Sequence, residues 1–166
     1  MQVPIRKPGK YTHSAIDHNI TESKYEELRA ELTRLKNIAL PAAAKEAARL
    51  AEHGDFSENA GYQVAKGKLR GINQHIIELE EMIKYAKIIK PQKNSDVVGM
   101  GSTVTFEQNG KHTTYKILGS AESNPSAGVI SANSPIGAAL LGHRVGDSVK
   151  IQIKDRINIY KILKIE

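Results

Sequence analysis

Residues 65–86 read AKGKLRGINQHIIELEEMIKYA, and apolar side chains recur in them at alternating steps of four and three. The members of this seam are Ala65, Leu69, Ile72, Ile76, Leu79, Ile83 and Ala86. A heptad seam of this kind predicts a helix that packs lengthwise against another helix. Most intervening residues are charged, as expected of solvent-facing positions, and Pro91 ends the pattern.

A second seam lies upstream and provides the expected partner helix. From Thr21 onward apolar residues recur at the same steps. Thr21 or Ser23 can cap this helix, and Ser23 with Glu26 has the spacing of a capping box. Pro41 interrupts the seam, and beyond it the apolar face continues one position later. This pattern predicts one long helix with a kink or register shift near Pro41. The upstream seam consists of Tyr25, Leu28, Leu32, Leu35, Ala39 and Ala42, followed by Ala43, Ala47 and Leu50.

Two seams of matching length joined by a short break predict an antiparallel helical hairpin. About thirty residues at about 1.5 Å each give a rod on the order of 45 Å long. The break, residues 54–60, reads GDFSENA and would lie at the end of the rod. It carries two acids, Asp55 and Glu58.

These two acids admit two compatible interpretations. Their spacing suits a capping box, with Asp55 at the N-cap and Glu58 at N3 of the second helix. Alternatively, both carboxylates face one Mg²⁺ ion, which prefers six oxygen ligands. Two carboxylates are too few to hold that ion alone, so a partner would have to supply the remaining ligands.

From about Asp96 the apolar period changes from helical to two, which predicts strands. Val104 and Phe106 alternate with threonines, and Asn109-Gly110 is a strong hairpin-turn signal. Ser134, Pro135 and Gly142 delimit one short helix. The expected fold class is therefore α+β: residues 1–20 form a flexible arm, residues 21–90 the hairpin, and residues 96–166 a small antiparallel sheet domain with one short helix. Residues 91–95 would be the linker.

Composition excludes several classes of protein. The 166 residues include no cysteine, so disulfides and thiolate metal sites are excluded. No run of about 18 apolar residues occurs, and no N-terminal leader is evident, so we expect a cytoplasmic protein without a membrane partner. The net charge of +6 permits nucleic-acid contact, but 5% aromatic residues make a base-stacking platform implausible.

The segment 54–62, GDFSENAGY, resembles the "GDLSENAEY" signature of the bacterial Gre-type transcript cleavage and elongation factors, the GreA family. The resemblance continues in order from Thr21 to Ile165. Its further motifs are Lys66, Leu79-Glu80, Gly101-Ser102-Thr103-Val104, Tyr115-Lys116-Ile117-Leu118-Gly119, Ile130-Ser131, Ser134-Pro135, Ala139-Leu140-Leu141-Gly142 and Gly146-Asp147.

The resemblance implies a coiled-coil hairpin and an FKBP-like C-terminal domain. It also implies a monomer that docks on RNA polymerase and passes its hairpin down the secondary channel. Asp55 and Glu58 would then help to hold a Mg²⁺ ion of the polymerase, which itself cleaves the 3′ end of backtracked RNA. No cofactor would be bound by this chain alone, and the chain would not be an enzyme.

The resemblance also suggests roles for other residues. Lys66 and Arg70, one turn apart, would contact phosphates of the nascent RNA, although an ordinary solvated face has the same appearance. Glu122, Ser134 and Pro135 would belong to the polymerase-docking region. His53, beside the break, is better explained as a residue at a helix C-terminus than as a metal ligand.

The chain departs from the family pattern in ways that keep a second function open. Gly61, Leu40 and Ala138 stand where charged residues are usual, and the run 120–124 keeps only Glu122 of an acidic stretch. Weakened docking would suit a Gre-like competitor that occupies the channel and inhibits transcription. A third hypothesis, beside the cleavage factor and the competitor, is an FKBP-like prolyl isomerase or chaperone. The scarcity of aromatic residues in the C-terminal domain disfavours it.

Overall fold

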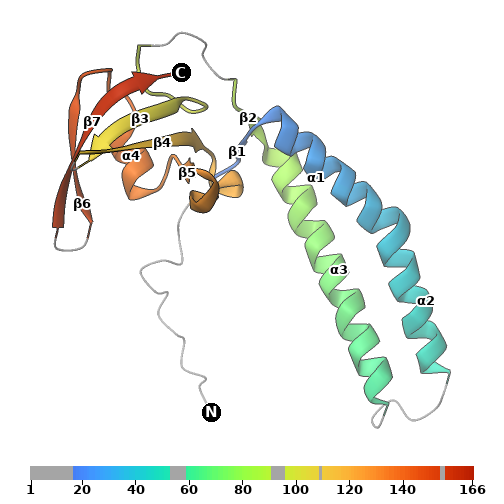
Figure 1. The fold of residues 1–166 in the computed structure, drawn as a ribbon. Helices are drawn as coiled ribbons and strands as arrows, with labels where there is room; N and C mark the ends of the chain where they lie inside the picture. The colour runs from blue at the N-terminus through green and yellow to red at the C-terminus, as the bar shows by residue number, and fades with distance from the viewer. Residues whose placement is uncertain (1–16, 53–58, 91–95, 109, 154–155) are drawn as a thin grey trace, which may run out of the picture.

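The computed structural model describes residues 17–52, 59–90, 96–108, 110–153 and 156–166. A helical hairpin projects from a small sheet domain, and its far end points away from the sheet (Figure 1). The first leg contains α1 (Glu22–Arg34), a π-helical segment (Leu35–Ala39) and α2 (Leu40–Ala51). The second leg is α3 (Ala60–Tyr85), which packs against all three. The predicted hairpin is confirmed.

The π-helical segment explains the register shift in the first leg. A proline inside an α-helix clashes with the carbonyl group four residues earlier, which here belongs to Asn37. The wider π-helical turn lies directly before α2, whose second residue is Pro41, and accommodates one additional residue. The apolar face therefore continues one position later, and the predicted register shift is confirmed.

The large buried side chains of the hairpin lie in the half nearest the sheet domain. Its core there consists of Ile20, Leu28, Leu35, Ile76 and Leu79. An ion pair between Lys36 and Glu80 also joins the legs, and the Nε2 of His75 lies 3.2 Å from a carboxylate oxygen of Glu31. Towards the far end the buried positions are alanines (Ala43, Ala47 and Ala65).

A short parallel strand pair closes the base of the hairpin. Strand β1 (Asn19–Ile20) pairs with β2 (Lys87–Ile88), directly after α3. The side chain of Ile20 is fully buried in the hairpin core. Residues 17–20, which the sequence assigned to the flexible arm, therefore belong to the folded hairpin.

Helix α1 begins at Glu22, directly after the first of its two candidate N-cap residues. The N-cap is Thr21, whose hydroxyl oxygen accepts a hydrogen bond from the backbone N–H of Lys24. Ser23 lies inside the first turn. The predicted capping box of Ser23 and Glu26 is therefore wrong, because threonine is also a good N-cap and occurs first.

The C-terminal domain is a five-stranded sheet with the order β5-β4-β3-β7-β6. Its strands are β3 (Thr103–Gln108), β4 (Lys111–Leu118), β5 (Val129–Ser131), β6 (Ser148–Ile153) and β7 (Arg156–Ile165). All pairings are antiparallel except that of β4 with β5. Two short 3-10 turns, Ser120–Glu122 and Pro125–Ala127, lie in the connection that makes this parallel pairing possible.

The predicted sheet with one short helix is confirmed, with β5 as a parallel addition. Helix α4 (Pro135–Leu140) packs against β5 and β6, and Leu140 is fully buried. Phe106 lies in the core between Tyr115 and Tyr160, with ring centroids 5.5 and 5.0 Å away. Gly110 has a φ of +75°, as a tight turn between β3 and β4 requires.

Candidate functional site

The end of the hairpin furthest from the sheet is held together by Asn59. This residue is the N-cap of α3, and its Oδ1 accepts a hydrogen bond from the backbone N–H of Tyr62 at 2.9 Å. Its Nδ2 donates to the carbonyl oxygen of Leu50, on α2, also at 2.9 Å. One amide side chain, which has both a donor and an acceptor, therefore caps one leg and binds the other.

Asp55 and Glu58, the predicted catalytic and metal-directed acids, fall in residues 53–58, outside the described residues. Covalent connectivity places them between the two ends that Asn59 joins, in the segment from Glu52 to Asn59. The capping-box interpretation is wrong for α3, because that helix begins at Ala60 with Asn59 as its cap. His53 is also outside the described residues.

Sequence reasoning overlooked Asn59, although the signal was present. Asparagine ranks with aspartate and serine as an N-cap residue, and it directly precedes the helical stretch. Asp55 was preferred only because Glu58 follows it at capping-box spacing. Asn59 reinforces the end of the hairpin directly beside the segment that carries the two acids.

Lys66 and Arg70 lie one turn apart on α3, and both are exposed. The Nζ of Lys66 lies 6.0 Å from the centre of the Tyr62 ring. Within the described residues neither forms an ion pair, whereas Arg49 on α2 is bound by Glu46 at 2.8 Å. The hydrogen bond from Arg49 lowers the pKa of Glu46, and the charges of Arg49 and Lys68 add to this effect. Among the described residues, Lys66 and Arg70 are thus exposed cations without an ion-pair partner, as are Lys45 and Lys68.

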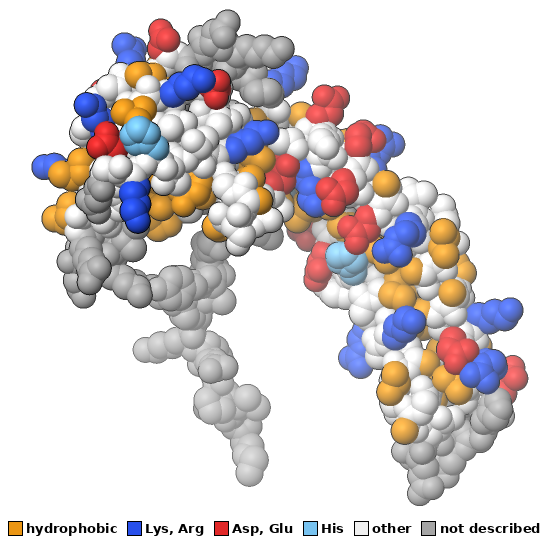
Figure 2. Space-filling model, in the orientation of Figure 1, with side chains coloured by type: hydrophobic (Ala, Val, Ile, Leu, Met, Phe, Trp, Pro, Cys, Tyr) orange, Lys and Arg blue, Asp and Glu red, His pale blue; other side chains and the backbone are white. Residues whose placement is uncertain are grey.

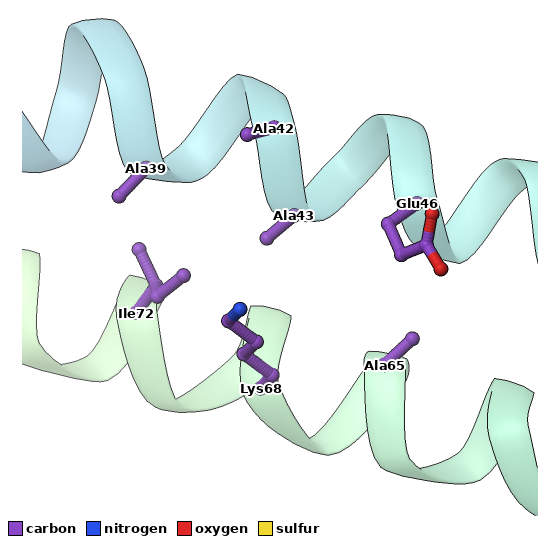
Figure 3. Close-up of a pocket in the computed structure, with 7 residues that line it drawn as sticks. All are labelled: Ala39, Ala42, Ala43, Glu46, Ala65, Lys68 and Ile72. Atoms are coloured by element: carbon purple, nitrogen blue, oxygen red, sulfur yellow. The ribbon is translucent and has the colours of Figure 1, made fainter.

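A small apolar cavity separates the legs between this region and the hairpin core. Its volume is about 180 Å³. Figure 3 shows Ala39, Ala43 and Glu46 on one leg facing Ile72, Lys68 and Ala65 on the other. Alanine side chains are too short to fill the space between two helices, so we attribute the cavity to packing. It offers no set of groups suited to catalysis.

Charge is distributed unevenly along the hairpin. Figure 2 shows acidic side chains gathered over the half next to the sheet domain, and basic side chains further along. Lys66 and Arg70 belong to the far half. The described part of the far half therefore offers basic side chains to a polyanion that lies along it.

The predicted docking residues come together at one end of the sheet. Ser134 is the N-cap of α4: its hydroxyl oxygen accepts from the N–H of Gly137 at 3.0 Å and donates to the carbonyl oxygen of Ser131 at 2.6 Å. Pro135 follows and is exposed. The hydroxyl group of Ser131 is 2.9 Å from that of Ser120, in the turn that contains Glu122.

Glu122 has partners that the sequence did not reveal. One carboxylate oxygen accepts from the backbone N–H of Thr21 and the other from the Thr21 hydroxyl group, both at 2.7 Å. These contacts join residues 101 positions apart in the sequence. No local pattern can report a pairing over such a distance.

Within the described ranges, no three histidine, aspartate or glutamate side chains are grouped so that they could hold a metal ion. None of the helices in the described part of the chain is both long enough and apolar enough to cross a membrane.

Comparison with known proteins gives matches along nearly the whole chain. Residues 18–88 match a family model described as "Transcription elongation factor, N-terminal", and residues 92–166 match "Transcription elongation factor, GreA/GreB, C-term". The transcription elongation factor GreA of Thermomicrobium roseum is 40% identical over 149 residues, covering 89% of this chain and 96% of that one. GreA of Helicobacter pylori is 40% identical over 144 residues, covering 85% and 88%. Among solved structures, GreA factor homolog 1 of Thermus thermophilus is 30% identical, covers 89% of this chain and 97% of that one, and superposes with a TM-score of 0.41.

Proposed function

Because the chain belongs to the GreA/GreB family of transcription elongation factors, we propose that it inserts its hairpin into the secondary channel of bacterial RNA polymerase. There it stimulates cleavage of backtracked RNA 3′ ends and rescues arrested complexes. We expect it to act as a monomer in the bacterial cytoplasm, where the polymerase works. The bonds of the RNA are broken by the polymerase, and the chain contributes side chains to that reaction.

The observation that carries this proposal is the position of the acidic segment. The 26 residues of α3 at a rise of about 1.5 Å each make a leg about 39 Å long. The segment with Asp55 and Glu58 joins the legs at the end furthest from the sheet domain (Figure 1). A narrow rod with acids at its end can enter a channel that excludes a globular domain.

The chemistry of the two acids suits Mg²⁺ supplied by the polymerase. Carboxylate oxygens are the ligands this ion prefers, but two side chains leave most of its six positions to water or to a partner. When bound, the ion would lower the pKa of an attached water molecule and neutralise charge on the phosphate. Asp55 and Glu58 would hold it and accept hydrogen bonds from that water.

Lys66 and Arg70 would bind the extruded RNA. Their positive charge is uncompensated by ion pairs with described residues, and they lie on the leg that begins beside the acids. Contacts to phosphate depend on charge and weaken with added salt. The substitutions Lys66→Ala and Arg70→Ala should therefore reduce cleavage most at low salt and make it less dependent on salt.

Docking on the polymerase is assigned to the surface around Ser134 and Pro135. Pro135 is exposed at the start of α4, and the hydrogen bonds of Ser134 fix the backbone there.

A prolyl isomerase function finds no support, because Phe106 and Tyr160 are only 1% and 3% exposed. These two rings pack with Tyr115 in the core instead of lining a pocket.

A transcript-shortening assay tests the proposal. Polymerase halted in a backtracked complex should shorten its RNA faster after the protein is added with Mg²⁺. Glu52→Ala is a suitable control for substitutions of Asp55 and Glu58, because this acid is exposed and lies just before the connecting segment. Inhibition of transcription without cleavage would instead identify a competitor for the channel.

A further inference from the structure

Among the described residues, the sheet domain is hydrogen-bonded to the base of the hairpin through one compact contact. On the hairpin side it involves residues 17–21, and on the sheet side residues 119–122; we call these two segments the domain junction. Four hydrogen bonds cross it, all of them to the carboxylates of Asp17 and Glu122. Both acids therefore have defined partners in the other domain.

Glu122 completes the cap of a helix in the other domain. In a capping box, the side chain at N3 accepts a hydrogen bond from the backbone N–H of the N-cap residue. The N3 residue of α1 is Lys24, which has no acceptor. Glu122 takes this role instead: it accepts from the N–H and the hydroxyl group of Thr21 and places negative charge at the positive end of α1.

Asp17 makes the reciprocal contact from the hairpin side. Its Oδ2 accepts from the backbone N–H of Ser120 at 3.0 Å and from the Ser120 hydroxyl group at 3.3 Å. Its Oδ1 is bound by the backbone and side-chain nitrogens of Asn19. The carboxylate thus fixes the strand that closes the hairpin relative to the turn that contains Glu122.

Gly119 brings the two backbones close enough for these bonds to form. A Cβ atom at this position would lie 1.6 Å from the carbonyl oxygen of Asn19. The obstacle is backbone in a hydrogen-bonded strand, which cannot rotate away as a side chain can. Any larger residue at position 119 must therefore separate the domains.

We propose that the domain junction is a positioning device, in which Glu122, Asp17 and Gly119 set the angle of the hairpin relative to the sheet domain. The angle matters because the hairpin is long. A rotation of about 15° at the base would move the far end of a 26-residue helix by about 10 Å. Misplacement of a reacting group by even about 1 Å can cost roughly 100-fold in rate.

The direct test measures orientation in the free protein and does not depend on the proposed function. The chain has no cysteine, so spin labels can be attached to Gly71→Cys on α3 and Lys150→Cys on β6 without other changes. Gly71 has open space around it and Lys150 is exposed. The distance between the labels should follow a single narrow distribution, measured by double electron–electron resonance.

Two variants should change that distribution. Glu122→Gln keeps the size of the side chain but directs an amide N–H₂ group towards the Thr21 donors, and Gly119→Ala introduces the clash. We expect a shifted or broadened distance in both, and an unchanged one in Glu107→Gln, a carboxylate of β3 outside the junction. A distribution unchanged in both junction variants would overturn the proposal.

The effect of the domain junction on RNA cleavage rests on the proposed function, and a cleavage assay measures it separately. Glu122→Gln should slow RNA cleavage by about tenfold or more at saturating protein, where the amount of polymerase bound is no longer limiting. A short bismaleimide bridge between Thr21→Cys and Glu122→Cys should restore cleavage, while the unbridged pair should not. Normal cleavage despite a changed distance would refute the positioning role and leave the proposed function intact.

Discussion

At the scale of single residues, two polar side chains each cap a helix and also form a hydrogen bond to another part of the molecule. Asn59 caps one helix and binds the other, and Thr21 caps α1 while donating to Glu122. Both were partly visible in the sequence, since asparagine and threonine are preferred N-cap residues. Their second partners were not visible, because they lie in other elements.

Two substitutions of Asn59 separate the helix-capping role of its side chain from its bond to the other leg. Asn59→Ser should keep the cap, which needs only an acceptor, and lose the bond to Leu50, for a cost of about 1 kcal/mol in the free energy of unfolding. Asn59→Ala should lose both and cost roughly 1 kcal/mol more. Urea denaturation of the three proteins measures both steps, and equal costs for the two variants would show that the cap contributes nothing.

Asp17 should make stability depend on pH in the acid range. Partial burial by itself raises the pKa of Asp17, but hydrogen bonds from Asn19 and Ser120 outweigh it and hold the pKa below the ordinary value of 3.8. Because the unfolded chain binds this proton more readily, the contribution of Asp17 to the free energy of unfolding is complete above about pH 4. It is lost as the pH falls through the lowered pKa.

Comparison of the wild type with Asp17→Asn isolates this effect. The difference between their free energies of unfolding should be constant near neutral pH and should shrink below about pH 4. Urea denaturation at a series of pH values measures it. A difference that stayed constant down to about pH 2 would show that Asp17 does not titrate in a hydrogen-bonded state.

At the scale of elements, the heptad seams predicted the two legs well because helix packing follows local periodicity. Ile76 and Leu79 of the downstream seam are buried in the hairpin core, as the pattern predicted. The sheet was predicted less completely, since β5 is three residues long and joins by a parallel pairing that no turn motif announces. The register shift near Pro41 was predictable, but its π-helical form was not.

The buried seam should be far more sensitive to truncation than the exposed face. Leu79 is 4% exposed in the hairpin core, and Leu79→Ala should lower the free energy of unfolding by about 2–5 kcal/mol. Ile77, two residues away, is 56% exposed, and Ile77→Ala should cost about 0.5 kcal/mol or less. Thermal and urea unfolding followed by circular dichroism would test this, and similar costs for both would contradict the assigned packing.

At the scale of the whole molecule, the fold separates the acidic segment from the sheet domain by the length of the hairpin (Figure 1). Sequence periodicity was enough to predict this separation, because it depends only on two legs of similar length and a short connection. The domain junction was not predictable, because its bonds join residues about a hundred positions apart. In our proposal, the junction fixes the direction in which the hairpin extends from the sheet domain.

Because of the same separation, RNA cleavage and polymerase binding should depend on different residues. Changes in the connecting segment should remove cleavage while leaving polymerase affinity intact, since docking is assigned to the other end of the molecule. Conversely, Pro135→Ala should weaken binding and leave the maximal cleavage rate at saturating protein close to normal. Titration of the protein into a cleavage assay separates these two effects, and a lower maximal rate for Pro135→Ala would argue against its docking role.

The central claim is that Asp55 and Glu58 hold Mg²⁺ in the polymerase active site, and the Mg²⁺ dependence of RNA cleavage tests it most directly. The rate should be measured in backtracked complexes saturated with wild type, Asp55→Asn or Glu58→Gln. Both variants should bind normally, cleave about 100-fold more slowly at low Mg²⁺, and recover part of the rate as Mg²⁺ is raised. Cleavage by both variants at the wild-type rate and with the wild-type Mg²⁺ dependence would contradict the account.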